Sequence, residues 1–201
     1  MKKIFSVFFA VLLMFSFAGC NNNPTAKEAE IQRGKIKGNT YTSKTTGLKF
    51  TKPDSWRYLT DAELAQALSI NEEVLSNNNF MSALDEYPTL LDMMLMNDET
   101  GLNMAIGYEN LEVTMGGVIS EDEYLDTMAN YLQTMGATVT EENETVYLSS
   151  QAYRHAVFTV EIDGLVTVTE YYLRGIDKYM NVITVAYTSD ITTPNIEKMF
   201  S

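Results

Sequence analysis

The sequence predicts an α+β fold, specifically an α/β/α sandwich with a mostly antiparallel central sheet. Runs of β-forming residues are joined by short turns such as Asp163-Gly164, which is typical of hairpins and therefore of antiparallel pairing. Residues 181–187 are apolar on both faces, so we expect this strand to be covered on both sides. A sheet with helices on each face is the simplest arrangement that provides such cover.

Composition excludes several classes of protein. The chain has 201 residues, of which 45% are hydrophobic, and it carries 14 Lys and Arg against 27 Asp and Glu, a net charge of −13. The apolar content excludes wholesale disorder, and the acidic balance argues against a nucleic-acid partner. The single Cys and single His exclude an intramolecular disulfide, a multi-Cys metal site and any site built on two imidazoles. We expect no cofactor and no metal.

The N-terminus has the pattern of an export signal. Lys2 and Lys3 precede an uncharged apolar run, residues 4–18, which is too short to span a membrane comfortably and suits a signal peptide. The run ends in Phe17-Ala18-Gly19-Cys20, which resembles the lipobox of bacterial lipoproteins, although Phe17 stands where Leu is usual. The alternative is a plain secretory signal with an incidental Cys.

The lipobox resemblance implies a processing route and an address. Residues 1–19 would be the signal peptide, and diacylglyceryl-Cys20 would be the new N-terminus, held in a lipid bilayer. The protein would be anchored in a cell membrane and face outside the cytoplasm. A modified Cys20 would be neither a nucleophile nor a metal ligand.

The charges are distributed unevenly along the chain. Residues 20–39 are predicted to be a polar tether and residues 40–201 a single globular domain. Residues 21–57 hold 8 cations and 3 anions, whereas residues 58–153 hold 18 anions and no Lys or Arg. A cation near an anionic membrane gains about 1 kcal/mol. One hypothesis is that this field orients the domain on its tether, and the alternative is ordinary solubilisation.

The first half of the domain contains two predicted hairpins and two predicted helical regions. Residues 41–43 and 48–51 flank Thr46-Gly47 and form a predicted hairpin. Thr60 and Glu63 have the spacing of a capping box, which predicts a helix through Leu68. The remaining predicted elements are helical pieces over 71–87 and strands over 90–96 and 102–111.

The second half contains one long helix and three strands. Ser120 and Glu123 form a second capping box, and the helical spacing of apolar residues continues until Gly136. Pro194 is expected at an early position of a terminal helix. The predicted strands are 146–162, with a break near Gln151, then 165–173 and 179–188.

Residues 47–56, Gly47-Leu48-Lys49-Phe50-Thr51-Lys52-Pro53-Asp54-Ser55-Trp56, resemble the opening of PsbP-like domains. The Tyr-rich strand at Tyr171-Tyr172, the aliphatic strand after Tyr179 and the last helix are similar to the closing part of these domains. The resemblance covers about residues 40–200 and implies an α/β/α sandwich with an antiparallel sheet. The family includes the extrinsic photosystem II protein, a Ran-binding protein and many bacterial lipoproteins of unknown role, so it implies no reaction and no functional residue.

The only imidazole, His155, is the first candidate for chemistry. Counting from the Asp163-Gly164 turn, strand alternation places Tyr172 opposite His155 and Glu170 on the same face. An imidazole with a carboxylate and a hydroxyl is typical of general-base catalysis. The chain contains no G-x-S-x-G nucleophile elbow, so a structural or surface His is the favoured interpretation.

Two further groups of residues invite a binding interpretation. Met93, Met94, Met96 and Met104 offer thioethers for Cu(I), but Met also fills apolar cores, which is the favoured interpretation. The acidic clusters match no EF-hand loop and are interpreted as solvated charge.

Four residues of the first hairpin region are the preferred location for a binding site. Trp56 and Tyr41 would line a groove in which Arg57 and Lys52 bind an anion. A packed aromatic cluster at the start of the domain is the favoured interpretation of these aromatic residues.

The predicted function is that of a lipoprotein acting as a binding or protein-interaction module for an unknown envelope protein or small ligand. The alternatives are an envelope hydrolase that uses His155 and a purely structural envelope or adaptor protein.

Overall fold

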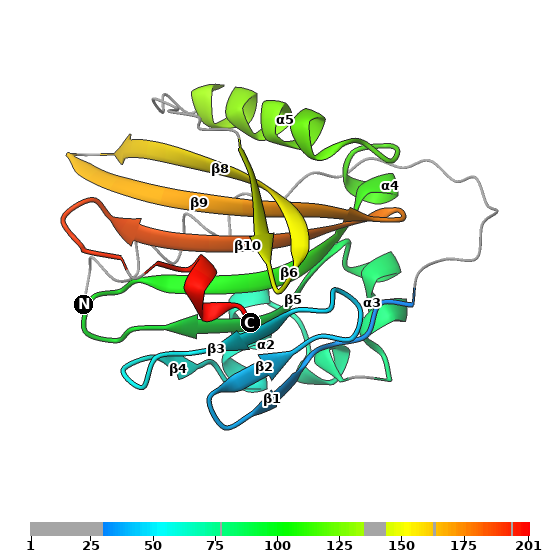
Figure 1. Cartoon of the computed structure of the whole chain (residues 1–201). Helices are drawn as coiled ribbons and strands as arrows, with labels where there is room; N and C mark the ends of the chain where they lie inside the picture. The colour runs from blue at the N-terminus through cyan, green and yellow to red at the C-terminus, as the bar shows by residue number, and fades with distance from the viewer. Residues whose placement is uncertain (1–29, 77, 135–143, 163, 194) are drawn as a thin grey trace.

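The structure is a computed structural model, and it describes residues 30–76, 78–134, 144–162, 164–193 and 195–201 (Figure 1). Several predictions concern residues outside these ranges. They are the signal peptide, the lipobox with Cys20, the first part of the tether, the helix end at Gly136, the turn residue Asp163 and the helix start at Pro194. In the described part, no helix is both long enough and apolar enough to cross a membrane.

A seven-stranded antiparallel sheet forms the centre of the molecule, in the order β4-β5-β6-β10-β9-β8-β7. Every strand pair in it is antiparallel, which confirms the predicted α+β class and the antiparallel sheet. The strands are β4 (Arg57–Tyr58), β5 (Thr89–Met96), β6 (Asn103–Asn110), β7 (Glu144–Leu148), β8 (Gln151–Ile162), β9 (Leu165–Ile176) and β10 (Tyr179–Thr188). The predicted break near Gln151 is the turn between β7 and β8.

A second, three-stranded sheet contains the first predicted hairpin. Its strands are β1 (Lys35–Lys37), β2 (Thr40–Thr42) and β3 (Lys49–Thr51). Strand β1 lies inside the segment predicted to be a tether, and Ile31 before it is only 2% exposed. Residues 31–39 are therefore part of the folded domain, so any flexible tether is shorter than predicted.

The helices are α2 (Asp61–Leu68), α3 (Phe80–Glu86), α4 (Leu111–Thr114) and α5 (Glu121–Thr134), with 3-10 helices η2 (Glu72–Leu75) and η3 (Glu197–Met199). Both predicted capping boxes are confirmed. The Thr60 hydroxyl accepts from the Glu63 amide, and the Ser120 hydroxyl accepts from the Glu123 amide. The predicted terminal helix is wrong. Within the described residues 195–201 only a 3-10 turn forms, because Phe200 adopts an extended conformation and bridges Phe50 in β3.

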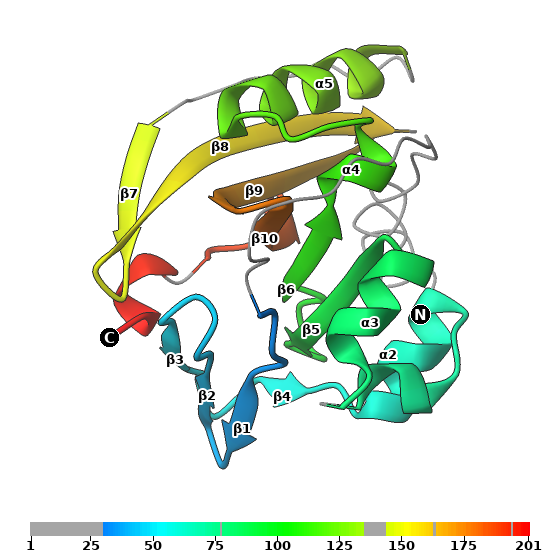
Figure 2. The same ribbon diagram turned by 90° about the vertical axis from the view of Figure 1, so that its right-hand side faces the viewer.

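Different elements cover the two faces of the main sheet. Helices α4 and α5 pack on the face that carries Phe158, Tyr171 and Val182. The opposite face carries Tyr172 and Ile183, and there the small sheet and the C-terminal residues supply the cover within the described ranges. Figure 2 shows α5 and the small sheet on opposite sides of the main sheet. The expectation of helices on each face is therefore corrected, since the first hairpin forms a covering sheet instead of joining the central one.

The core confirms the predictions for β10 and for the methionines. Strand β10 is buried from Tyr179 through Ala186, so it is covered on both faces as expected. Helices α2 and α3, together with η2, pack against β5 and β6. The four methionines predicted to be core are all buried, at 9% exposure or less: Met93, Met94, Met96 and Met104.

Candidate functional site

His155 lies on β8 and stacks on Tyr172 of β9. The two residues are direct cross-strand partners, which confirms the predicted register. Their ring centroids are 4.4 Å apart, and the ring planes differ by 19°. The imidazole is buried, with the residue only 8% exposed. The strand pairing therefore holds this ring in one position against a flat aromatic surface.

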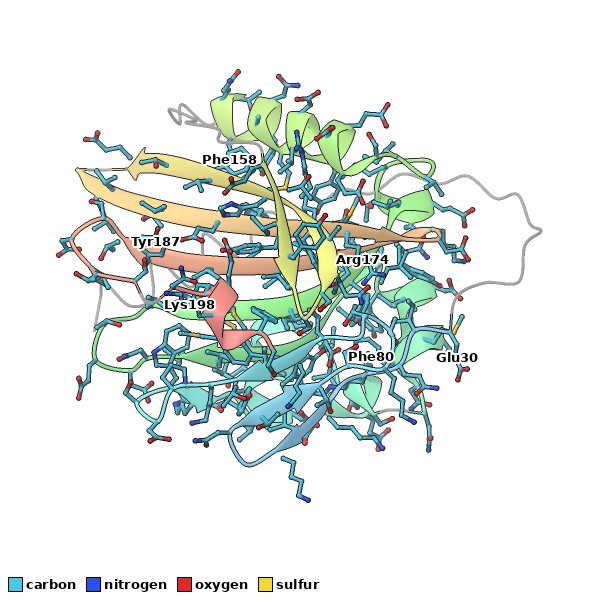
Figure 3. The ribbon with its side chains drawn as sticks, in the orientation of Figure 1. Glu30, Phe80, Phe158, Arg174, Tyr187 and Lys198 are labelled. Carbon is cyan, nitrogen blue, oxygen red and sulfur yellow. The ribbon has the colours of Figure 1, made fainter. Side chains whose placement is uncertain are left out.

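A carboxylate from β9, Glu170, faces the same cluster as predicted. Its two oxygens accept hydrogen bonds from the phenols of Tyr172 at 2.7 Å and Tyr187 at 2.9 Å, the latter labelled in Figure 3. Burial raises the pKa of Glu170, but the nearby imidazole of His155 and the hydrogen bonds from the two phenols outweigh burial and lower it. Glu170 is thus held as a carboxylate.

The two ring nitrogens of His155 face different carboxylates. Nδ1 lies 3.3 Å from Oε1 of Glu144, and Nε2 lies 3.6 Å from Oε2 of Glu170. The second distance is too long for a hydrogen bond, and Nε2 has no other partner among the residues that the structure describes. Burial lowers the pKa of His155, but Glu170 and Glu144 more than compensate, so the pKa is raised.

This geometry favours a structural role for His155. Catalysis by a triad needs a hydroxyl or thiol nucleophile bonded to the imidazole, and in the described contacts the imidazole faces two carboxylates instead. Glu144 and Glu170 approach opposite ring nitrogens, so they are not placed to share one metal ion with the ring. Across the described residues, no group of three or more His, Cys, Asp or Glu side chains is placed to hold a metal. The cluster instead ties β7, β9 and β10 to β8.

The structure does not bring the four predicted binding residues together in a groove. Tyr41 and Trp56 are 0% and 4% exposed and belong to the core beneath the small sheet, which agrees with the favoured interpretation of a packed aromatic cluster. Arg57 is half-exposed and forms ion pairs with Glu63 and Asp98. Lys52 donates to the backbone carbonyl of Pro53.

A buried carboxylate that sequence reasoning missed, Asp92, lies in β5 at a bulge between Leu91 and Met93. It is 1% exposed. Its oxygens accept hydrogen bonds from the Gly34 amide, at 2.8 and 3.0 Å, and from the phenol of Tyr41 at 2.6 Å. Burial raises the pKa of Asp92 to about 6, in spite of these donors and of nearby Arg33.

Arg33 completes this network from the segment that precedes β1. Its guanidinium forms two hydrogen bonds with the Asp61 carboxylate, at 2.6 and 2.8 Å, and also donates to the carbonyls of Leu75 and Asp92. One signal in the sequence was available, because Asp92 is a charged residue inside the apolar run 90–96. A charge at such a position calls for a partner. The network fastens the segment before β1 to the body of the domain.

Comparison with known proteins adds no relationship, since no family model matches the chain and no curated protein matches it. The resemblances to lipoproteins and to PsbP-like domains therefore stay predictions.

Proposed function

We propose that the protein is a membrane-anchored extracytoplasmic lipoprotein whose folded domain acts as a binding or protein-interaction module. The observation that carries the proposal is the short interval between the lipobox Cys and the fold. Ile31, eleven residues after Cys20, is already buried. Eleven extended residues reach at most about 40 Å. A domain joined to a lipidated Cys20 by this segment would stay next to the bilayer.

We further propose that the domain is PsbP-like. The support comes from the residues that carry the resemblance. Leu48, Phe50 and Trp56 of the 47–56 pattern are all buried in one cluster between the two sheets. The apolar positions of the pattern thus have a common structural role in this fold.

Binding is favoured over catalysis because the only imidazole is engaged by carboxylates. An enzyme of the triad class needs an imidazole free to exchange a proton with a nucleophile. The envelope hydrolase is tested by screening generic esterase and peptidase substrates with the natural protein and with His155→Gln. Activity that disappears with the imidazole, in a variant with unchanged circular dichroism, would overturn the binding module.

Lipidation is tested with Cys20→Ser in the producing bacterium. The natural protein is expected to incorporate radiolabelled palmitate and to fractionate with membranes. The Cys20→Ser variant should lose the label, while Asn21→Ser, the neighbouring substitution, should keep it. Equal labelling of Cys20→Ser and the natural protein would refute the lipoprotein assignment.

A further inference from the structure

The outward side of the small sheet carries three lysines in register. Lys35 pairs with Thr42, which pairs with Lys49, and Lys37 pairs with Thr40, which pairs with Thr51. Strand alternation directs the intervening Tyr41 and Phe50 to the core, where both are 0% exposed. One side of the sheet, here named the basic face, therefore consists of Lys35, Lys37, Lys49, Thr40, Thr42 and Thr51.

The three lysines of the basic face differ from the cations that form ion pairs inside the domain. Arg33, Arg57, Arg154 and Lys178 each form at least one ion pair with Asp or Glu. Lys35, Lys37 and Lys49 are exposed and form none within the described part of the chain. Strands β1–β3 contain no acidic residue. Within the described residues, no carboxylate lies at ion-pair distance from Lys35, Lys37 or Lys49.

The opposite side of the domain is acidic. Residues 58–153, which include α2, α3, α4 and α5, contain 18 acids and no Lys or Arg. Helix α5 begins with Glu121, Asp122 and Glu123, and it lies across the main sheet from the small sheet (Figure 2). An anionic surface would attract the basic face and repel the α5 side. The two sides therefore define an electrostatic orientation.

We propose that the basic face docks on the anionic lipid headgroups of the bilayer that holds the anchor. This proposal rests on the proposed lipid anchoring. The segment from Cys20 leads through Ile31 and Arg33 directly into β1, so the strand nearest the anchor along the chain is part of the basic face. Arg33 is excluded from the face because its charge is used inside the domain.

The test uses the full mature protein, reconstituted in vesicles that carry a nitroxide quencher on the lipid headgroup. A fluorophore on Thr42→Cys reports on the basic face, and one on Gln133→Cys in α5 reports on the far side. Quenching at Thr42 is expected in phosphatidylglycerol vesicles, and not in phosphatidylcholine vesicles or in about 1 M salt, where the Debye length is roughly 3 Å. Quenching at Gln133 should stay low throughout.

Charge variants measure the contribution of each lysine. About 1 kcal/mol per cation corresponds to about a fivefold change in the docked-to-undocked ratio. Lys37→Gln should therefore reduce the ratio about fivefold, and the triple variant Lys35→Gln, Lys37→Gln, Lys49→Gln about 100-fold. Lys178→Gln is the matched control, since it removes one cation that is paired with Asp85 and Glu112 away from the basic face. It should leave quenching unchanged.

Two readouts separate failure of this surface from failure of the anchor. Equal quenching of Thr42 and Gln133, equal quenching in both lipids, or equal loss in Lys37→Gln and Lys178→Gln would overturn the docking surface. Flotation with phosphatidylcholine vesicles tests the anchor alone. A protein that does not float with them, but is still quenched at Thr42 by phosphatidylglycerol vesicles, would refute the anchor and support the basic face.

Discussion

Tyr41 and Asp92, 51 residues apart in the sequence, are joined by a buried hydrogen bond of 2.6 Å from the phenol to Oδ2 of the carboxylate. It links β2 of the small sheet to β5 of the main sheet. Tyr41→Phe removes the donor and leaves the ring in place. Because hydrogen bonds to charged groups contribute about 1.5–3 kcal/mol, the free energy of unfolding should fall by that amount in urea titrations.

The control for this prediction is Tyr147→Phe. Tyr147 is 68% exposed, so the loss of its hydroxyl should change the free energy of unfolding by less than about 0.5 kcal/mol. Equal stability of the two variants would show that the Tyr41–Asp92 bond does not help to hold the sheets together.

Asp92 also gives the domain a specific pH dependence. Its pKa is raised to about 6 in the folded protein, chiefly by burial, against about 4 in an unfolded chain. The folded state thus binds this proton more tightly than the unfolded state does. The stabilisation by this group is complete below about pH 4 and is lost as the pH rises through about 6, by up to about 3 kcal/mol.

This dependence is isolated by comparing the natural protein with Asp92→Asn. Other carboxylates with lowered pKa values, such as Asp61 and Glu170, change stability in the opposite direction as the pH falls. The difference between the two proteins cancels those groups. From pH 4 to pH 7, the natural protein should lose free energy of unfolding relative to Asp92→Asn, and a constant difference would contradict the assignment.

Gly34 is required by the same network because its Cα lies against the Tyr41 ring. A Cβ at Gly34 would come within 2.2 Å of Cε2 of Tyr41. The ring is buried and hydrogen-bonded, so it has little freedom to move. Gly34→Ala should lower the free energy of unfolding by about 1–3 kcal/mol, a typical cost of overpacking. Gly117→Ala, where a Cβ meets no atom within 4 Å, should not, and similar thermal unfolding of both variants would contradict this prediction.

His155 gives a direct measurement of its two carboxylates, because it is the only His in the chain. Its pKa is raised by Glu170 and Glu144 against the effect of burial. Titration of the single imidazole by NMR should give a lower pKa in Glu170→Gln and a smaller decrease in Glu144→Gln, whose side chain is 64% exposed. An unchanged pKa in Glu170→Gln would refute the pairing.

The raised pKa of His155 also determines how this residue changes the free energy of unfolding with pH. The folded state binds the imidazole proton more tightly than the unfolded state. The stabilisation is therefore complete below the pKa of the unfolded chain and is lost as the pH rises through the raised pKa. Glu170→Gln should flatten this part of the stability profile, measured by urea unfolding at a series of pH values above 6.

The parts of the fold that the sequence predicted correctly depend on local patterns. The Asp163-Gly164 sequence pattern predicts the register of the two strands, and the pairing of His155 with Tyr172 confirms it. Each of the two capping boxes is formed by residues only three positions apart, and these short patterns correctly predicted where α2 and α5 begin. The pattern of apolar residues likewise identified β10 as a strand buried on both faces.

The parts that it predicted incorrectly depend on contacts between distant residues. The sequence of β1 is Lys-Ile-Lys, which has the composition of a polar tether. Its extended conformation depends on pairing with β2. Arg33 and Asp61 are 28 residues apart, and Gly34 and Asp92 are 58 apart. No local spacing connects such residues. For the same reason, the sequence could not decide between a binding groove and a packed cluster for Tyr41 and Trp56, and the structure places them in the core.

The contact between Phe50 and Phe200 brings the two ends of the folded domain together. Their ring centroids are 5.1 Å apart, and the backbone amide of Ser201 donates to the carbonyl of Lys49. The three strands of the small sheet are therefore synthesised early. Their contacts with residues 200 and 201 can form only after those residues have been synthesised. Until then β3 lacks this contact on one edge, so that edge of the small sheet is covered only after all the intervening residues have been made.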